Sequence, residues 1–267
     1  MSPPTSATVP APRFSACIEW ILAAEYPDFL ERVRAAARLG LYGVEFHFWR
    51  NKPLEALTRV LGETGLVLTS FIVEPRVCLT AADQRREEFL QALSDTLAAA
   101  RNVGARAVVV ASGPADGSND RARQHAAMVA GLRLAAPRVA DSGVMLLLEP
   151  VNTRVDHPGV FLDGTVEGLD VIEEVGSPSI RLLFDIYHSH AMQEDLATVL
   201  GARTHLVSHV QAADLPGRHQ PGTGQIAWPQ VWSALVARGY SGPVGLEYRP
   251  EGAGPASLAQ TRRAFGG

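Results

Sequence analysis

Four apolar segments in the second half of the chain each end in a side chain that carries an oxygen. A buried strand has little reason to end in a carboxylate unless something there needs a negative oxygen, because an unpaired buried charge is costly. Four oxygen ligands, three of them anionic, suit a hard divalent cation such as Mg2+ or Mn2+. Without a cation, at least one of three clustered carboxylates would tend to stay protonated. We therefore predict a metal site with the ligands Glu149, Asp185, Gln211 and Glu247.

Four further polar residues are candidates for holding a substrate. His188 is favoured because it follows a proposed ligand by three residues, and Arg218 because a guanidinium is a two-pronged donor for a carboxylate. Asn152 and Glu45 complete this set, although Glu45 has a competing interpretation as the structural partner of a nearby arginine. Five histidines are interpreted as structural, namely His125, His157, His190, His205 and His209.

The apolar periodicity predicts strands that alternate with helices along the whole chain. The predicted strands are 13–18, 43–48, 66–73, 107–111, 144–149, 180–186, 205–212 and 244–248. The predicted helices are 28–39, 53–61, 81–103, 120–139, 165–175, 195–200, 228–238 and 255–265. Eight such units favour the α/β class and a closed (β/α)8 TIM barrel formed as a single domain. In that fold every strand opens its carboxyl end onto one face, so the four proposed ligands would meet there.

Composition narrows the function classes. The 267 residues, 46% of them hydrophobic, suffice for one large core, and the formal charge of −4 argues weakly against nucleic acid as a partner. Cys17 and Cys78 have no disulfide or zinc spacing, and we expect both to be small buried apolar residues. No apolar run is long enough to span a membrane. We expect a disordered tail over 1–12, the barrel over 13–267 and a cytoplasmic protein; a homo-oligomer is left open.

Several motifs together resemble the hydroxypyruvate isomerase family, which belongs to the xylose-isomerase-like TIM barrel superfamily. The resemblance implies that the four oxygen ligands bind a divalent metal and that Glu149 and Glu247 also act as the acid/base pair. The related ketose 3-epimerases usually have His at the position of Gln211. The motifs lie at 43–46, 149–159, 184–188, 209–214, 216–224 and 245–250.

The resemblance implies a metal-dependent isomerase that interconverts the ketone and aldehyde forms of a small hydroxy-oxo acid. Hydroxypyruvate and tartronate semialdehyde are the type case, and the proton would move through an enediolate. A ketose 3-epimerase with the same metal and glutamates is an alternative, and a non-catalytic sugar-acid binding protein is a more distant one. A DNA-repair endonuclease of the same superfamily would need histidines at the ends of strands three and four, where 71–73 and 111–113 contain none.

Overall fold

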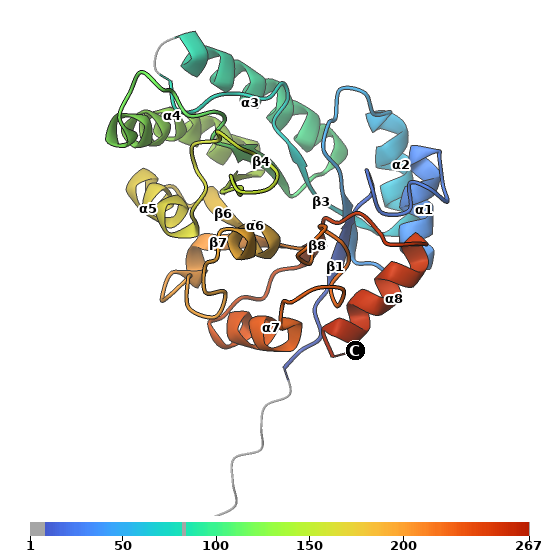
Figure 1. Cartoon of the computed structure of the whole chain (residues 1–267). Helices are drawn as coiled ribbons and strands as arrows, with labels where there is room; N and C mark the ends of the chain where they lie inside the picture. The colour runs from blue at the N-terminus through green and yellow to red at the C-terminus, as the bar shows by residue number, and fades with distance from the viewer. Residues whose placement is uncertain (1–8, 82–83, 267) are drawn as a thin grey trace, which may run out of the picture.

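The computed structural model describes residues 9–81 and 84–266 and forms a closed barrel of eight parallel strands (Figure 1). The strands are β1 (Phe14–Cys17), β2 (Gly43–Glu45), β3 (Val67–Ile72), β4 (Ala107–Ala111), β5 (Met145–Glu149), β6 (Ile180–Asp185), β7 (Val207–Ala212) and β8 (Val244–Leu246). The helices are α1 (Phe29–Arg38), α2 (Leu54–Thr64), α3 (Gln84–Val103), α4 (Arg121–Ser142), α5 (Thr165–Val175), α6 (Ile186–Ala191), α7 (Trp228–Ala237) and α8 (Gly254–Ala264). The predicted (β/α)8 TIM barrel is confirmed.

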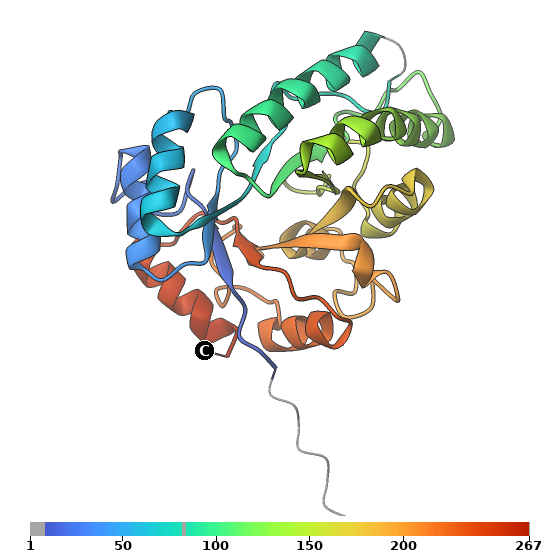
Figure 2. The same cartoon turned by 180° about the vertical axis from the view of Figure 1, so that it is seen from behind.

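The ring closes where the first strand meets the last. β1 pairs with β2 on one side and with β8 on the other, so Ser15 lies level with both Gly43 and Gly245. Both views place α8 beside α1, which completes the outer layer of helices (Figure 2). Residues at the two ends of the sequence therefore share one side of the barrel.

Alternation along each strand separates the two packing layers. The residues of β4 at positions 108 and 110 face the helices, while Val109 packs inside the barrel with Leu147 and Leu183. Because side chains alternate with period two, the residues two positions further along β5 and β6 also point inward. These are Glu149 and Asp185, which explains why acidic side chains end two otherwise apolar strands.

One predicted helix was placed wrongly. Residues 196–200 form turns, and the short helix after β6 is α6, which begins directly at Ile186. The cause is Asp185, whose side chain accepts hydrogen bonds from the backbone N–H groups of Tyr187 and His188 and so caps the helix. Strands β2 and β8 are also shorter than predicted: they end at Glu45 and Leu246, whereas the predicted strands end at 48 and 248.

The expectations for the N-terminal tail and for the burial of the two cysteines agree only in part with the structure. Of the expected tail, residues 1–8 lie outside the described part of the chain, while the carbonyl of Pro10 accepts a hydrogen bond from Trp232 Nε1 at 2.7 Å. Cys17 is buried as expected, but Cys78 is only half-buried, and neither forms a disulfide. None of the helices that the structure describes has both the length and the apolarity needed to cross a bilayer.

Candidate active site

The barrel mouth brings together carboxylates from three strands that are far apart in the sequence. Arg218 Nη2 lies 2.9 Å from Glu247 Oε2 and 3.8 Å from Asp185 Oδ2. His188 Nε2 lies 3.7 Å from Asp185 Oδ2 and 3.8 Å from Glu149 Oε1. The predicted residues Glu149, Asp185, Glu247, His188 and Arg218 thus form one cluster.

The three carboxylates do not hold their protons equally. Burial raises the pKa of Glu149 well above its usual range, and the negative charges of Glu247 and Asp185 raise it further. Burial also raises the pKa of Asp185 to about 7, although Arg218 opposes the shift. Burial acts in the same direction on Glu247, but Arg218 and His47 outweigh it and lower its pKa to about 2. Protein groups alone therefore favour a protonated Glu149 beside an ionised Glu247.

Gln211 presents an unsatisfied oxygen from β7. Its Nε2 donates to Glu45 Oε1 at 2.9 Å, and a carboxylate only accepts, so the amide oxygen must face the other way. That buried Oε1 has no hydrogen-bond partner within the described residues. A buried acceptor without a partner is uncommon, and an amide oxygen beside three carboxylates is the donor set of a hard divalent cation. The residues present therefore fit Mg2+ or Mn2+.

Glu45 lies below the mouth and holds other residues in place. Its carboxylate accepts hydrogen bonds from Thr69 Oγ1 at 3.1 Å and from Gln211, and it contacts His209 Nε2 at 2.9 Å. No arginine is among the partners found for it in the described chain, so the expected arginine pair was wrong. Glu45 is 2% exposed and does not line the main cavity, so its geometry favours orientation of Gln211 over contact with substrate.

His188 is held by Asn152 from the loop after β5. Asn152 Nδ2 lies 2.7 Å from His188 Nδ1, which makes Nδ1 the acceptor and leaves a hydrogen on Nε2, facing Glu149. Burial and Arg218 lower the pKa of His188 to about 3, so its imidazole is a neutral donor. Asn152 itself is fully buried and outside the lining of the cavity, so it positions His188 instead of facing substrate.

Arg218 is fixed between aromatic rings and acids. Its guanidinium lies over the rings of Trp20 and Tyr187, at 5.2 and 5.0 Å from their centres. The surrounding carboxylates raise its pKa although burial opposes this, so the side chain remains a cation. The backbone of Arg218 has φ +55°, an uncommon conformation for a side-chain-bearing residue. Such a conformation persists only where the surrounding loop is well determined.

Asp214 organises that loop from inside. Its fully buried carboxylate accepts hydrogen bonds from the N–H groups of Leu215, Gly222 and Ile226 and from Trp228 Nε1, at 2.9 to 3.3 Å. The loop over 214–226 thus closes around one acceptor. Sequence reasoning missed this role.

We expect Asp214→Ala to lower the free energy of unfolding by about 3 kcal/mol, because several buried donors lose a charged acceptor. The free energy is measured by urea denaturation. Asp120→Ala is the control, since Asp120 caps α4 at the exposed surface with one bond to Arg123 N at 2.8 Å. Loss of that cap costs about 1 kcal/mol. Equal losses in the two variants would contradict the assigned role of Asp214.

A cavity of about 510 Å³ opens above the cluster. One side of its lining is apolar and comes from the ends of β3 and β4, including Ile72, Val109 and Ala111. The other side holds Glu149, Glu247 and further polar residues that sequence reasoning did not assign to a substrate site. These are His47, Arg76, Asp156, His157 and Arg249. His157, expected to be structural, therefore faces the cavity.

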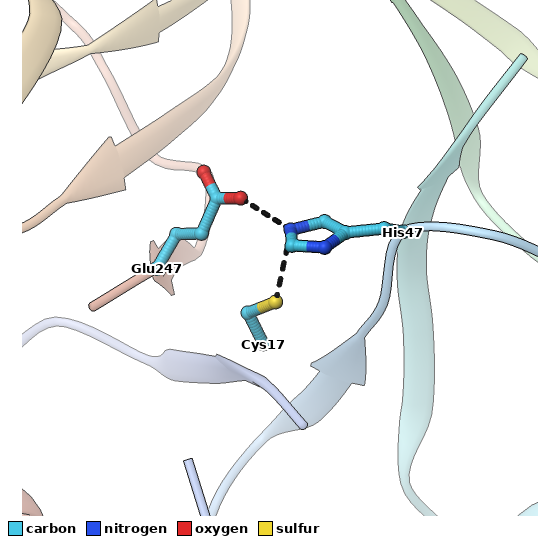
Figure 3. Close-up of side chains that lie close together, drawn as sticks. All are labelled: Cys17, His47 and Glu247. Atoms are coloured by element: carbon cyan, nitrogen blue, oxygen red, sulfur yellow. Dashed lines mark hydrogen bonds and ion pairs between the residues drawn. The ribbon is translucent and has the colours of Figure 1, made fainter. Parts of the chain in front are cut away.

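The position of His47 near the end of a predicted strand could have identified it as a residue of the mouth. It follows β2 by two residues, and its Nε2 lies 2.6 Å from Glu247 Oε1 and 3.5 Å from Cys17 Sγ (Figure 3). Burial opposes the charged form of His47, but contacts with Cys17 and Glu247 raise its pKa to about 11. Burial also raises the pKa of the Cys17 thiol, although His47 opposes the shift.

The chain is similar to known proteins of one fold family over nearly its whole length. The xylose isomerase-like TIM barrel family model matches residues 33–265. Hydroxypyruvate isomerase of Escherichia coli K12 is 34% identical over 248 residues, covering 90% of this chain and 94% of that protein. 2-Oxo-tetronate isomerase of Cupriavidus necator is 32% identical over 261 residues, covering 96% and 99%. A Brucella melitensis crystal structure, named AP endonuclease, family 2, has TM-score 0.85 and 32% identity and covers 93% and 97%. The chain therefore belongs to the xylose isomerase-like TIM barrel family and is one of its isomerases.

Proposed function

We propose that the protein is a metal-dependent isomerase of a small hydroxy-oxo acid, of the type that interconverts hydroxypyruvate and tartronate semialdehyde. The observation that carries this proposal is the unpartnered oxygen of Gln211 beside the buried carboxylates of Asp185 and Glu247 and the half-buried carboxylate of Glu149. Glu149, Asp185, Gln211 and Glu247 would hold the cation. A divalent cation bound there would polarise the substrate carbonyl and stabilise negative charge on the substrate oxygens.

The two glutamates divide the proton transfer between them. Glu247, which Arg218 and His47 keep ionised, removes a proton from the hydroxymethyl carbon of hydroxypyruvate. Glu149, whose pKa burial raises, delivers a proton to the neighbouring carbonyl carbon. The hydroxyl proton moves to the former carbonyl oxygen in the same conversion, so substrate and product have the same composition. Each glutamate then regains its starting state by proton exchange.

Two side chains hold the substrate during this transfer. The His188 Nε2–H, fixed by Asn152, points towards Glu149 and can donate to a substrate oxygen between them. Arg218 is the candidate for the substrate carboxylate, because its planar guanidinium offers paired donors. One Nη2–H of Arg218 is used in the ion pair with Glu247, and the remaining guanidinium N–H groups would bind the substrate carboxylate.

An endonuclease is a second candidate because of the name of the Brucella relative. The chemistry of the strand ends opposes it, since β3 and β4 end at Ile72 and Ala111 and no histidine follows within 73 or 112–113. The chain also has a formal charge of −4, which does not favour a phosphate backbone. A ketose 3-epimerase would use the same glutamates and differs only in which carbon regains the proton.

The test is proton NMR in deuterated water with Mn2+, using hydroxypyruvate and candidate ketoses in separate reactions. We expect hydroxypyruvate to yield tartronate semialdehyde with deuterium on the former carbonyl carbon, because the proton that Glu149 delivers has exchanged with the solvent. Deuterium confined to carbon 3 of a ketose, with its epimer as product, would identify an epimerase instead. Tight binding without exchange would identify a binding protein, and cleavage of an abasic-site duplex would identify an endonuclease.

A further inference from the structure

Glu247 is held at both of its carboxylate oxygens by side chains from two different parts of the chain. His47 Nε2 lies 2.6 Å from Oε1, and Arg218 Nη2 lies 2.9 Å from Oε2. Glu149 differs, because no hydrogen bond to its carboxylate is found within the described residues, and the basic nitrogen found within ion-pair distance is His188 Nε2, at 3.8 Å. The Glu247 carboxylate is therefore held at both oxygens, whereas the Glu149 carboxylate is not.

The fold places His47 for this contact. His47 follows β2, Glu247 follows β8, and both strands pair with β1, which ends at Cys17. The backbone carbonyl of His47 accepts a hydrogen bond from Ile72 N at 3.0 Å, so its main chain is tied to β3. Its ring meets Trp20 edge to face at 5.0 Å, with Cys17 against the same nitrogen that faces Glu247 (Figure 3).

The spacing of the atoms favours a hydrogen-bonding role for His47 over a second cation site. Cys17, His47 and Glu247 lie close enough together to hold a metal ion. However, His47 Nε2 and Glu247 Oε1 lie 2.6 Å apart, which is a hydrogen-bond distance. Two ligand atoms of one metal ion lie farther apart, because each is about 2.0–2.2 Å from the ion and they point at it from different directions.

We propose that His47 is a positioning residue for Glu247, which it holds by an Nε2–H hydrogen bond to Oε1 in the orientation needed to bind the cation and to meet the substrate C–H. This inference rests on the proposed function, because it takes Glu247 as ligand and base. Groups that orient a metal-binding side chain typically change affinity or activity by about 10–100-fold when removed. His47→Leu removes the donor, while His47→Gln retains an amide N–H in its place.

The experiment measures steady-state kinetics with Mn2+ and hydroxypyruvate, and Mn2+ dissociation constants by titration calorimetry. We expect His47→Leu to lower kcat about 10–100-fold with KM nearly unchanged and to weaken Mn2+ binding, and His47→Gln to recover most of both. His125→Leu is the matched control: His125 lies on α4, pairs with Glu167 and Glu174, and has an equally covered side chain, 20% exposed against 23%. It should leave both quantities unchanged.

Each remaining outcome has a defined meaning. A raised KM with normal kcat in His47→Leu would show that His47 contacts the substrate. A His47→Gln variant as impaired as His47→Leu would show that the imidazole itself takes part in the chemistry. Either result would overturn the proposal. Two Mn2+ ions per wild-type chain, with one lost in Cys17→Ser, would overturn it in favour of a second metal site. Wild-type protein that binds Mn2+ without isomerising hydroxypyruvate would refute the proposed function alone, since Mn2+ affinity in the variants still tests His47.

Discussion

Glu149→Gln and Glu247→Gln should each reduce turnover by at least about 10²–10⁴-fold, the usual contribution of a positioned acid or base. A glutamine keeps the shape and one oxygen of the side chain but cannot carry the proton. The effect should be on kcat, because the transfer itself is lost. Turnover is measured under saturating Mn2+, so that weaker metal binding does not imitate loss of the proton carrier.

The fold should survive both substitutions. Burial raises the pKa of Glu149 and so disfavours its charge, and a neutral glutamine removes that cost. Thermal denaturation of Glu149→Gln should therefore resemble that of the wild type. Glu247→Gln should keep the circular dichroism spectrum but melt at a lower temperature, because Arg218 and His47 lose their charged partner. Glu167→Gln is the control: Glu167 lies on α5, is not among the residues that line the cavity, and is paired with Arg121. A near-normal rate in either active-site variant would refute the assignment of that glutamate.

Removal of divalent metal should abolish turnover and lower thermal stability. A chelator leaves the carboxylates of the mouth without the cation that favours their charged forms, so Glu149 takes up a proton, and added Mn2+ should restore activity. A ligand that binds only the folded state stabilises it by about 2.7 kcal/mol at one hundred times its dissociation constant. The measurement is the melting temperature across a Mn2+ titration, with activity assayed in the same samples.

Asp185→Asn separates metal binding from folding in this experiment. Asparagine is as good a helix cap as aspartate, so α6 should still begin after β6. The variant loses an anionic ligand, however, and its melting temperature should respond much less to Mn2+. An unchanged response would show that the cation binds elsewhere, and full activity in the presence of chelator would remove the cation from the proposal.

Local patterns in the sequence were sufficient to predict the barrel and the four strand-end oxygens. Alternation with period two is a property of each strand by itself, and parallel strands in a closed barrel end on the same face. The positions of Glu149 and Asp185 followed from these rules. The short helix was misplaced because its start depends on the rotamer of Asp185, which apolar periodicity does not report.

Tertiary structure decided which polar side chains meet. Glu45 and Asn152 were candidates for substrate contact, but strand register and loop closure bury them against Gln211 and His188. His47 and Glu247 lie 200 positions apart, and they touch only because barrel closure sets β8 beside β1 and β1 beside β2. The sequence by itself determined the fold and the chemical types at the mouth, because both follow from short-range spacing. The partners of each side chain depend on contacts between distant strands, and only the folded chain specifies those.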